Sequence, residues 1–242
     1  MIEVRRLSTL EEFSEALRLQ QCVWGFADVD LVPLPVFVVA NYAGGQVFGA
    51  FDGRCMIGFC LAFAGLKPCG PFLHSHMLAV LPEYRNSGIG RLLKLEQRSD
   101  ALNRGLDLME WTFDPLQIKN AYFNITRLGA IVRRYLDNEY GNTSSPLDGG
   151  LPTDRCVAEW WMDSRRVRGV VGEGPRVAGG ANRERISYPV DIARIREEDN
   201  ERARAIQREN ADRFIDAFAR GLAVTGFERS DTEGTYLLEP WQ

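Results

Sequence analysis

The chain has 242 residues, of which 45% are hydrophobic and 26% are charged, and its formal net charge is -4. This composition is typical of a folded globular protein, either one large domain or one domain with an extension. The acidic balance argues against nucleic acid or an anionic membrane surface as the main partner, and no apolar run reaches the about 18 residues of a membrane helix. Residues 1–10 are too charged for a secretory signal, so we expect a cytoplasmic protein.

The chain is predicted to begin with a strand and then a helix. Residues 2–7 are predicted to form a strand, and Ser8-Thr9-Leu10-Glu11 is a capping-box pattern that opens a helix. Further along, Asp52-Gly53 is a strong signal for a turn between two antiparallel strands. The remaining elements expected in this half are strands over 46–51, 56–64 and 72–80 and a helix over 88–103.

The second half begins with a predicted buried strand over residues 106–113. Asp114-Pro115 supplies an N-cap and a first-turn proline for a helix that ends near Gly129. Residues 165–185 are rich in glycine and arginine with little periodicity, which predicts a mobile loop or a linker. The other expected elements are strands over 130–140 and 154–162, an extended segment at 186–192, a helix over 199–220 and closing strands at 222–227 and 235–238.

The cysteines give no metal-binding pattern. They are odd in number, form no C-x-x-C pair and lack a histidine at metal-finger spacing. We therefore expect no metal site, and reduced thiols that are mostly buried. The five are Cys22, Cys55, Cys60, Cys69 and Cys156.

The only two histidines, His74 and His76, lie in the predicted strand over 72–80. A spacing of two places both imidazoles on the same face of a strand. With a pKa of about 6.5, an imidazole can take a proton from an ammonium group or a bound water near neutral pH. These residues are therefore candidate general bases, and the alternative is a structural pair in a partly buried polar ladder.

A glycine-containing turn, Arg85-Asn86-Ser87-Gly88-Ile89-Gly90, follows this strand and opens a predicted amphipathic helix. Such a turn can present unpaired backbone N–H groups and a positive helix end to a phosphate. It is not a dinucleotide fingerprint, because the third glycine would fall at Leu93, and no Gly-Lys-Ser/Thr of a P-loop follows. Either it binds a pyrophosphate of another kind, or its glycines serve backbone geometry alone.

The run from Leu78 to Leu93, with Asn120-Ala121 and Leu128-Gly129 after it, resembles the acyl-CoA-binding motifs of GNAT N-acyltransferases. The resemblance implies an α/β GNAT fold, with a mixed central sheet splayed at the acyl-CoA site and a C-terminal α/β extension. It also implies an acyltransferase domain over residues 1–164 and an extension over 165–242 packed on the same domain.

The same resemblance assigns roles in binding coenzyme A. It implies that backbone amides of the turn hold the pyrophosphate, and that free N–H groups of Leu78 and Val80 bind the thioester oxygen and the pantetheine arm. Asn120 and Asn124 would face the coenzyme, with a solvated helix face as the alternative for both. The full set of implied coenzyme-binding residues is Leu78, Ala79, Val80, Arg85, Asn86, Ser87, Gly88, Ile89, Gly90, Arg91, Asn120 and Asn124.

The histidine run is similar to the arylalkylamine N-acetyltransferase branch of the family, where histidines at both places conduct the proton. This implies that His76 is the nearer base and His74 a relay or substrate contact. Many members also place a tyrosine acid four residues before the glycine of the second motif, where this chain has Ile125. The resemblance therefore implies catalytic histidines without the usual acid.

The function we expect is transfer of an acyl group, acetyl by preference, from acyl-CoA directly to a small primary amine or amino acid. Phe113-Asp114-Pro115-Leu116 is similar to a predicted bacterial branch associated with N-acyl amino acid metabolism, which makes succinyl-CoA-dependent N-succinylation of amino acids an alternative. A CoA-binding regulator without catalysis is another. Polyanion binding through residues 165–185 ranks below these. We expect no nucleic-acid or membrane partner, and whether the chain forms a homodimer stays open.

Overall fold

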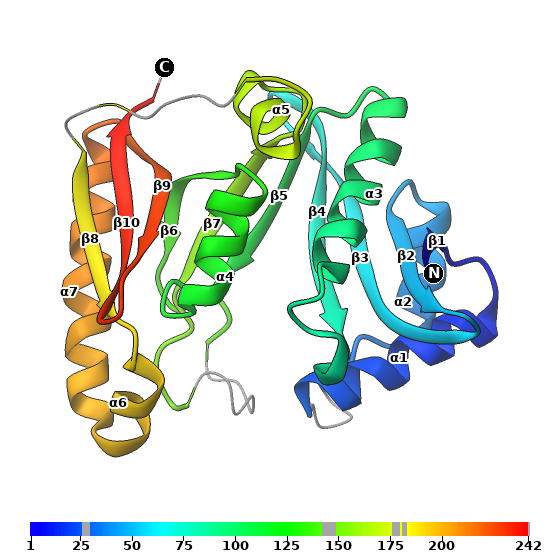
Figure 1. The fold of residues 1–242 in the computed structure, drawn as a ribbon, viewed down its shortest axis with the longest axis horizontal. Helices are drawn as coiled ribbons and strands as arrows, with labels where there is room; N and C mark the ends of the chain where they lie inside the picture. The colour runs from blue at the N-terminus through cyan, green and yellow to red at the C-terminus, as the bar shows by residue number, and fades with distance from the viewer. Residues whose placement is uncertain (26–29, 142–148, 176–179, 181–182, 242) are drawn as a thin grey trace. The chain divides into compact units, whose positions relative to one another are not determined.

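The computed structural model describes residues 1–25, 30–141, 149–175, 180 and 183–241. The chain divides into two compact units, Met1–Glu110 and Trp111–Gln242. The boundary between the units falls within strand β5 (Leu108–Phe113), which is labelled in Figure 1. The predicted division at residue 164 remains a prediction.

The first unit is a mixed sheet with helices. Its strands follow the spatial order β1-β2-β3-β4-β5, antiparallel from β1 to β4, and β5 pairs with β4 in parallel. The core packs Phe37 and Phe59 edge to face between helix and sheet. The elements are β1 (Ile2–Arg6), α1 (Leu10–Trp24), α2 (Leu34–Tyr42), β2 (Gln46–Asp52), β3 (Cys55–Lys67), β4 (Gly70–Val80), a 3-10 turn (Pro82–Tyr84) and α3 (Ile89–Asn103).

The start of α1 differs by one residue from the predicted capping box. Thr9, not Ser8, is the N-cap, and its side chain accepts a hydrogen bond from the backbone N–H of Glu12. The Glu12 carboxylate in turn accepts from the N–H groups of Ser8 and Thr9. Glu12 rather than Glu11 stands three residues after the cap, where a carboxylate can reach back.

Strand β4 carries an irregularity at His76. Its pairing with β3 runs Leu61 to Met77 and then Ala62 to Ser75, so the ladder passes over His76. An extra residue of this kind is a β-bulge, which bends a strand and changes the direction of a side chain. The predicted strand over 72–80 is thus confirmed in its position, but it is not a regular strand.

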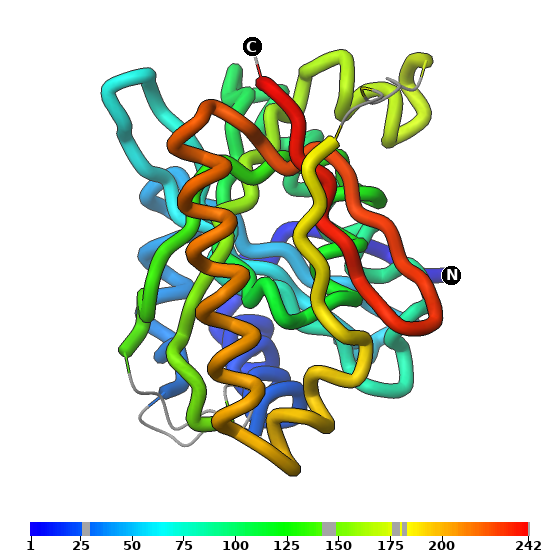
Figure 2. Tube along the Cα trace, turned by 90° about the vertical axis from the view of Figure 1, so that its left-hand side faces the viewer, coloured from blue at the N-terminus to red at the C-terminus, as the bar shows by residue number. Residues whose placement is uncertain are grey.

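The second unit begins with the end of β5 and continues the order β5-β7-β6-β9-β10-β8. Helix α7 lies along the C-terminal strands (Figure 2), where Phe214 stacks on Tyr135 and meets Tyr236 edge to face. The elements are α4 (Ile118–Tyr122), a π-helical turn (Phe123–Arg127), β6 (Ile131–Leu136), β7 (Arg155–Trp161), α5 (Arg165–Val171), β8 (Glu184–Pro189), α6 (Ile192–Glu198), α7 (Asn200–Ala219), β9 (Leu222–Arg229) and β10 (Glu233–Pro240).

Two predictions for this unit were wrong. Asp114 is not a helix N-cap, because its carboxylate accepts from the N–H of Leu116 in a turn, and α4 begins only at Ile118. Residues 165–171 are a helix, α5, rather than loop, because Ser164 caps its start and Gly172 ends it with a positive φ of 98°. Residues 176–179 and 181–182 of the predicted loop lie outside the described residues.

The cysteines are free thiols, as predicted, but three of the five are exposed. Only Cys60 and Cys156 are buried, so the expected burial of most thiols was wrong. Across the described residues, no helix is both long and apolar enough to cross a membrane. The same residues hold no group of three metal-ligating His, Cys, Asp or Glu side chains.

Candidate functional site

The two imidazoles lie next to each other on β4. Their ring centroids are 6.1 Å apart, and the ring of Phe63 on β3 lies 5.3 Å from that of His76. His74 is half-buried and His76 exposed, while Leu73, Ser75 and Met77 between and beside them are buried. The structure thus brings both predicted base candidates onto one face of the strand.

The surroundings of the histidines keep both rings neutral at pH 7. Burial, and then the charge of His76, lower the pKa of His74 to about 4. The pKa of His76 is also lowered, because the surrounding protein reduces the hydration of the ring and so disfavours its charged form. A neutral imidazole is the form that accepts a proton.

A partly buried ion pair borders His74. Glu110 of β5 stands opposite His74 in the parallel register and is 5% exposed. Its carboxylate pairs with the ammonium of Lys67, which lies over the ring of Phe72 at 4.6 Å. The Glu110 charge opposes the lowering of the His74 pKa, but burial prevails.

The opposite face of β4 carries a buried lysine that the sequence analysis missed. Lys94 of α3 is 3% exposed, and its Nζ donates to Oγ of Ser75 over 2.6 Å. Ser75 donates in turn to Oε1 of Gln97 over 3.2 Å. Polar side chains at three positions of the buried stripe of α3 (Lys94, Gln97 and Arg98) are the sequence signal that could have revealed this network.

The turn before α3 presents a run of unpaired backbone amides. No acceptor among the described residues takes the N–H groups from Asn86 to Gly90, and α3 has no side-chain cap. Asn86 and Gly88 have positive φ angles of 63° and 91° in this turn. Successive N–H groups in such a conformation form a concave site for an anion, so the predicted turn has a geometry suited to a phosphate.

The edge of β4 away from β3 carries the amides of Leu78 and Val80. The N–H of Leu81 donates to the carbonyl of Ile57 over 2.9 Å. Because alternate N–H groups of a strand point to opposite sides, those of Ala79 also face β3, and those of Leu78 and Val80 face away. Pairing of β4 with β5 within the first unit is limited to Leu73 and His74. Leu78 and Val80 therefore have the direction expected of donors to a ligand.

The other predicted site residues, Asn120 and Asn124, belong to the second unit. Asn120 is half-buried on α4, whereas Asn124 lies in the π-helical turn and is 2% exposed. Its Nδ2 has no hydrogen-bond partner in the described part of the chain. Ile125, at the position of the usual tyrosine, is 1% exposed and packs in the core.

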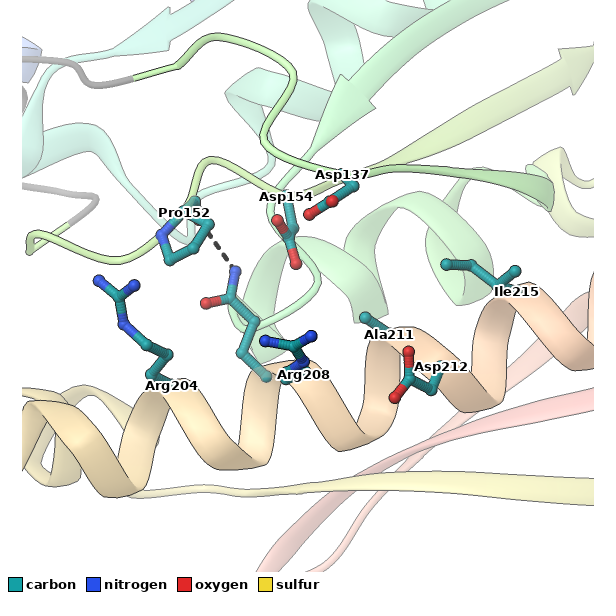
Figure 3. A pocket seen from close by; sticks show the side chains of 9 residues that line it. Asp137, Pro152, Asp154, Arg204, Arg208, Ala211, Asp212 and Ile215 are labelled. Carbon is teal, nitrogen blue, oxygen red and sulfur yellow. Dashed lines mark hydrogen bonds between the residues drawn. The ribbon is translucent and has the colours of Figure 1, made fainter.

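A hollow of about 230 Å³ in the second unit lies between α7 and the connection from β6 to β7 (Figure 3). Arg204 donates to the carbonyl of Gly150 over 3.1 Å, and Gln207 to that of Pro152 over 2.9 Å. These bonds tie the connection to α7, so we assign the hollow a structural role. The residues that line it are Asp137, Pro152, Asp154, Arg204, Gln207, Arg208, Ala211, Asp212 and Ile215.

Comparisons with known proteins agree on one family. Residues 10–123 match the model of the acetyltransferase (GNAT) family. The fold is similar to that of the ribosomal-protein-S18-alanine N-acetyltransferase from Escherichia coli, with a TM-score of 0.55, 16% identity and coverage of 75% of this chain and 99% of that chain. A comparison with curated proteins found no match.

Two further solved structures have the same fold. A GNAT acetyltransferase from Streptococcus pneumoniae has a TM-score of 0.53 and 14% identity, and covers 66% of this chain and 98% of that one. The NatC complex bound to Gag peptide and CoA has a TM-score of 0.52 and 18% identity, and the match covers 65% of this chain and 96% of that chain. Such low identities establish a common fold. The match to the family model identifies residues 10–123 as a GNAT acetyltransferase domain, and this domain places the protein in the class of acyltransferases.

Proposed function

We propose that this protein transfers an acyl group, acetyl by preference, from acyl-CoA to a small primary amine or amino acid without a covalent enzyme intermediate. The observation that carries the proposal is the pair of neutral imidazoles on β4, just before the outward amide of Leu78. An enzyme that acylates amines needs a proton acceptor beside the reacting carbonyl, because only the free amine attacks.

The residues for the donor are those of the turn and of β4. The unpaired amides from Asn86 to Gly90 suit a pyrophosphate, and the side chain of Arg85 and the backbone of Arg91 flank them. Backbone N–H groups at Leu78 and Val80 would bind the thioester oxygen and the pantetheine arm. A thioester supplies an activated acyl group with a good leaving group, and a donor at its oxygen stabilises the developing negative charge.

The buried side chain of Asn124 is a separate observation in favour of a bound ligand. A buried amide nitrogen without a partner is costly, and such groups in native proteins commonly await water or a ligand. We propose Asn124, with Asn120, as contacts to the coenzyme.

The proton path begins at His76 in this proposal. Its imidazole takes the proton of the acceptor ammonium, and His74, whose ring neighbours it, relays the proton or contacts the acceptor. The amine nitrogen forms the new bond to the acyl carbon as the carbon–sulfur bond breaks. Ile125 offers no acid, but a thiol with a pKa of about 8.5 needs little assistance to leave, and water suffices.

The proposal also concerns the identity of the acyl donor and of the amine acceptor. Succinyl-CoA with an amino acid acceptor is the alternative within the same chemistry, following the resemblance of residues 113–116 to the bacterial branch. A regulator that binds CoA without turnover is the alternative outside it, motivated by the missing tyrosine. We further propose that the protein acts in the cytoplasm, and sedimentation analysis decides between a monomer and a homodimer.

The experiment is release of free CoA thiol from the full chain with acetyl-CoA or succinyl-CoA and a panel of arylalkylamines, other small amines and amino acids. Two short peptides with free N-termini extend the panel, because the structural relatives include enzymes of protein and peptide amines. We expect turnover with a small amine. Calorimetric binding of acetyl-CoA without turnover for any pair would establish the regulator instead, and turnover with peptides alone would overturn the acceptor class.

A further inference from the structure

Lys94 is unusual for this chain. The sequence holds 29 Lys and Arg residues, but only three are lysines: Lys67, Lys94 and Lys119. An arginine stays charged in any protein environment, whereas a buried lysine can lose its proton. Lys94 is the one buried deep under the strand that carries both histidines.

The contacts of Lys94 join two strands at the place where they pair. Its Nζ donates to Oγ of Ser75 on β4 over 2.6 Å and lies 3.9 Å from Sδ of Met109 on β5. Ser75 stands between His74 and His76 and borders the bulge, and Met109 pairs with Leu73 in the parallel register. A change at Nζ therefore reaches the segment that sets the direction of both imidazoles.

We propose that Lys94 is a positioning residue for the histidine pair: it anchors the bulged segment of β4 through Ser75, and its ammonium charge disfavours a proton on His74. Only the effect of Lys94 on catalysis rests on the proposed function. The contact and the electrostatic effect are properties of the folded chain and can be measured without turnover.

The charges around His74 determine the sign of the effect. The positive charges of Lys94 and Lys67 oppose its protonation, and Glu110 on β5 favours it. The thiol of Cys60 on β3 is a titratable group near Lys94, but burial raises its pKa to about 12, so it stays neutral over this pH range. Burial lowers the pKa of Lys94 to about 7, so on acidification Lys94 is protonated before His74, whose pKa is about 4. The cation is then in place when His74 would otherwise begin to accept a proton.

Histidine NMR tests the proposal, because the chain has only two histidines and the Cε1–H signal of each ring can be followed separately. His74→Gln assigns the signals. The ring shifts are then followed from pH 8 to 3, a range that includes the expected His74 midpoint, in the wild type and in Lys94→Met, which keeps the length of the side chain and removes its charge. We expect the His74 midpoint to rise by about 0.5 pH unit or more in Lys94→Met. Lys119→Met, at an exposed helix position, is the matched control and should change neither midpoint.

Ser75→Ala gives a second, milder test that does not depend on Lys94→Met being folded. Loss of the hydroxyl removes the contact between Lys94 and β4, but the ammonium stays protonated at the pH where His74 titrates. The His74 midpoint should therefore stay close to that of the wild type, whereas the ring shifts of both histidines at pH 8 should change because the bulged segment has lost its anchor. An unchanged His74 midpoint in folded Lys94→Met, or unchanged ring shifts in Ser75→Ala, would overturn the proposal. A shift in a protein that shows no turnover would leave this proposal standing and contradict only the proposed function.

Discussion

His74 on β4 and Lys94 on α3 lie on opposite faces of β4, and the charge of Lys94 contributes to the low pKa of His74. Ser75, which stands between His74 and His76 in the sequence, accepts a hydrogen bond from Lys94 on the buried face. The imidazoles of His74 and His76 occupy the other face. One strand thus separates a buried cation from a pair of neutral bases.

The low pKa of His74 predicts a loss of stability in mild acid. The unfolded chain takes a proton on this residue with a pKa of about 6.5, but the folded chain only at about 4, so the unfolded state binds more protons between these values. The contribution of His74 to stability is complete above pH 6.5 and declines towards pH 4, by roughly 2–3 kcal/mol.

Urea unfolding at pH 7, 6 and 5 measures this effect, with His74→Gln as the comparison. The variant lacks the titrating group, so its stability should depend less steeply on pH than that of the wild type. Parallel pH dependences in the two proteins would show that His74 does not have a lowered pKa.

Gly88→Ala should weaken acetyl-CoA binding by about tenfold, because distortion of the turn misaligns its amides. An added Cβ meets no atom within 4 Å, so the effect comes from the φ of 91° rather than from a clash. Gly53, in the β2–β3 turn, has a φ of 58° and equally open space. Gly53→Ala should therefore cost similar stability, about 1 kcal/mol, without changing the Kd. Equal Kd values for both variants by calorimetry would argue against the turn as a binding site.

Arg166→Met should destabilise the protein by about 2–4 kcal/mol. The guanidinium donates to the carbonyls of Gly129 and Thr225, and burial lowers its pKa to about 10. Its loss leaves buried carbonyls unpaired. Arg168 on the same helix is exposed, and among the described residues its guanidinium has one ion pair, with Asp163 at 3.8 Å, so Arg168→Met is the control. Similar thermal unfolding midpoints for the two variants would refute a structural role of Arg166.

The sequence predicted most of the first unit because its signals are local. The Asp52-Gly53 turn and the apolar strands around it determine a hairpin by themselves, and the strand, turn and helix from residue 72 to 103 follow the same logic. The second unit was harder to predict. Asp114 formed its bond in a turn instead of a helix, and the arginine-rich α5 is held by carbonyls that are distant in the sequence, such as that of Thr225.

The candidate site divides in the same way. The spacing of His74 and His76 predicted that both imidazoles share one face, and the glycines of residues 85–90 predicted the turn. The bulge at His76 could not be predicted from the sequence of β4 alone, because it arises from the pairing of β3 with β4. Lys94 escaped notice because burial of a charged residue depends on tertiary packing. The roles of all these residues in binding and catalysis remain predictions.

The pH dependence of kcat/KM for acetyl transfer to the best amine tests the central claim most directly. With neutral imidazoles as bases, the wild type should retain activity below pH 6.5, and His76→Gln should lower kcat/KM by roughly 10²–10⁴-fold. The acidic limb that reports the histidines should also change in the variant. If His76→Gln keeps both the rate and the pH profile of the wild type, the imidazole is not the base and the account is wrong.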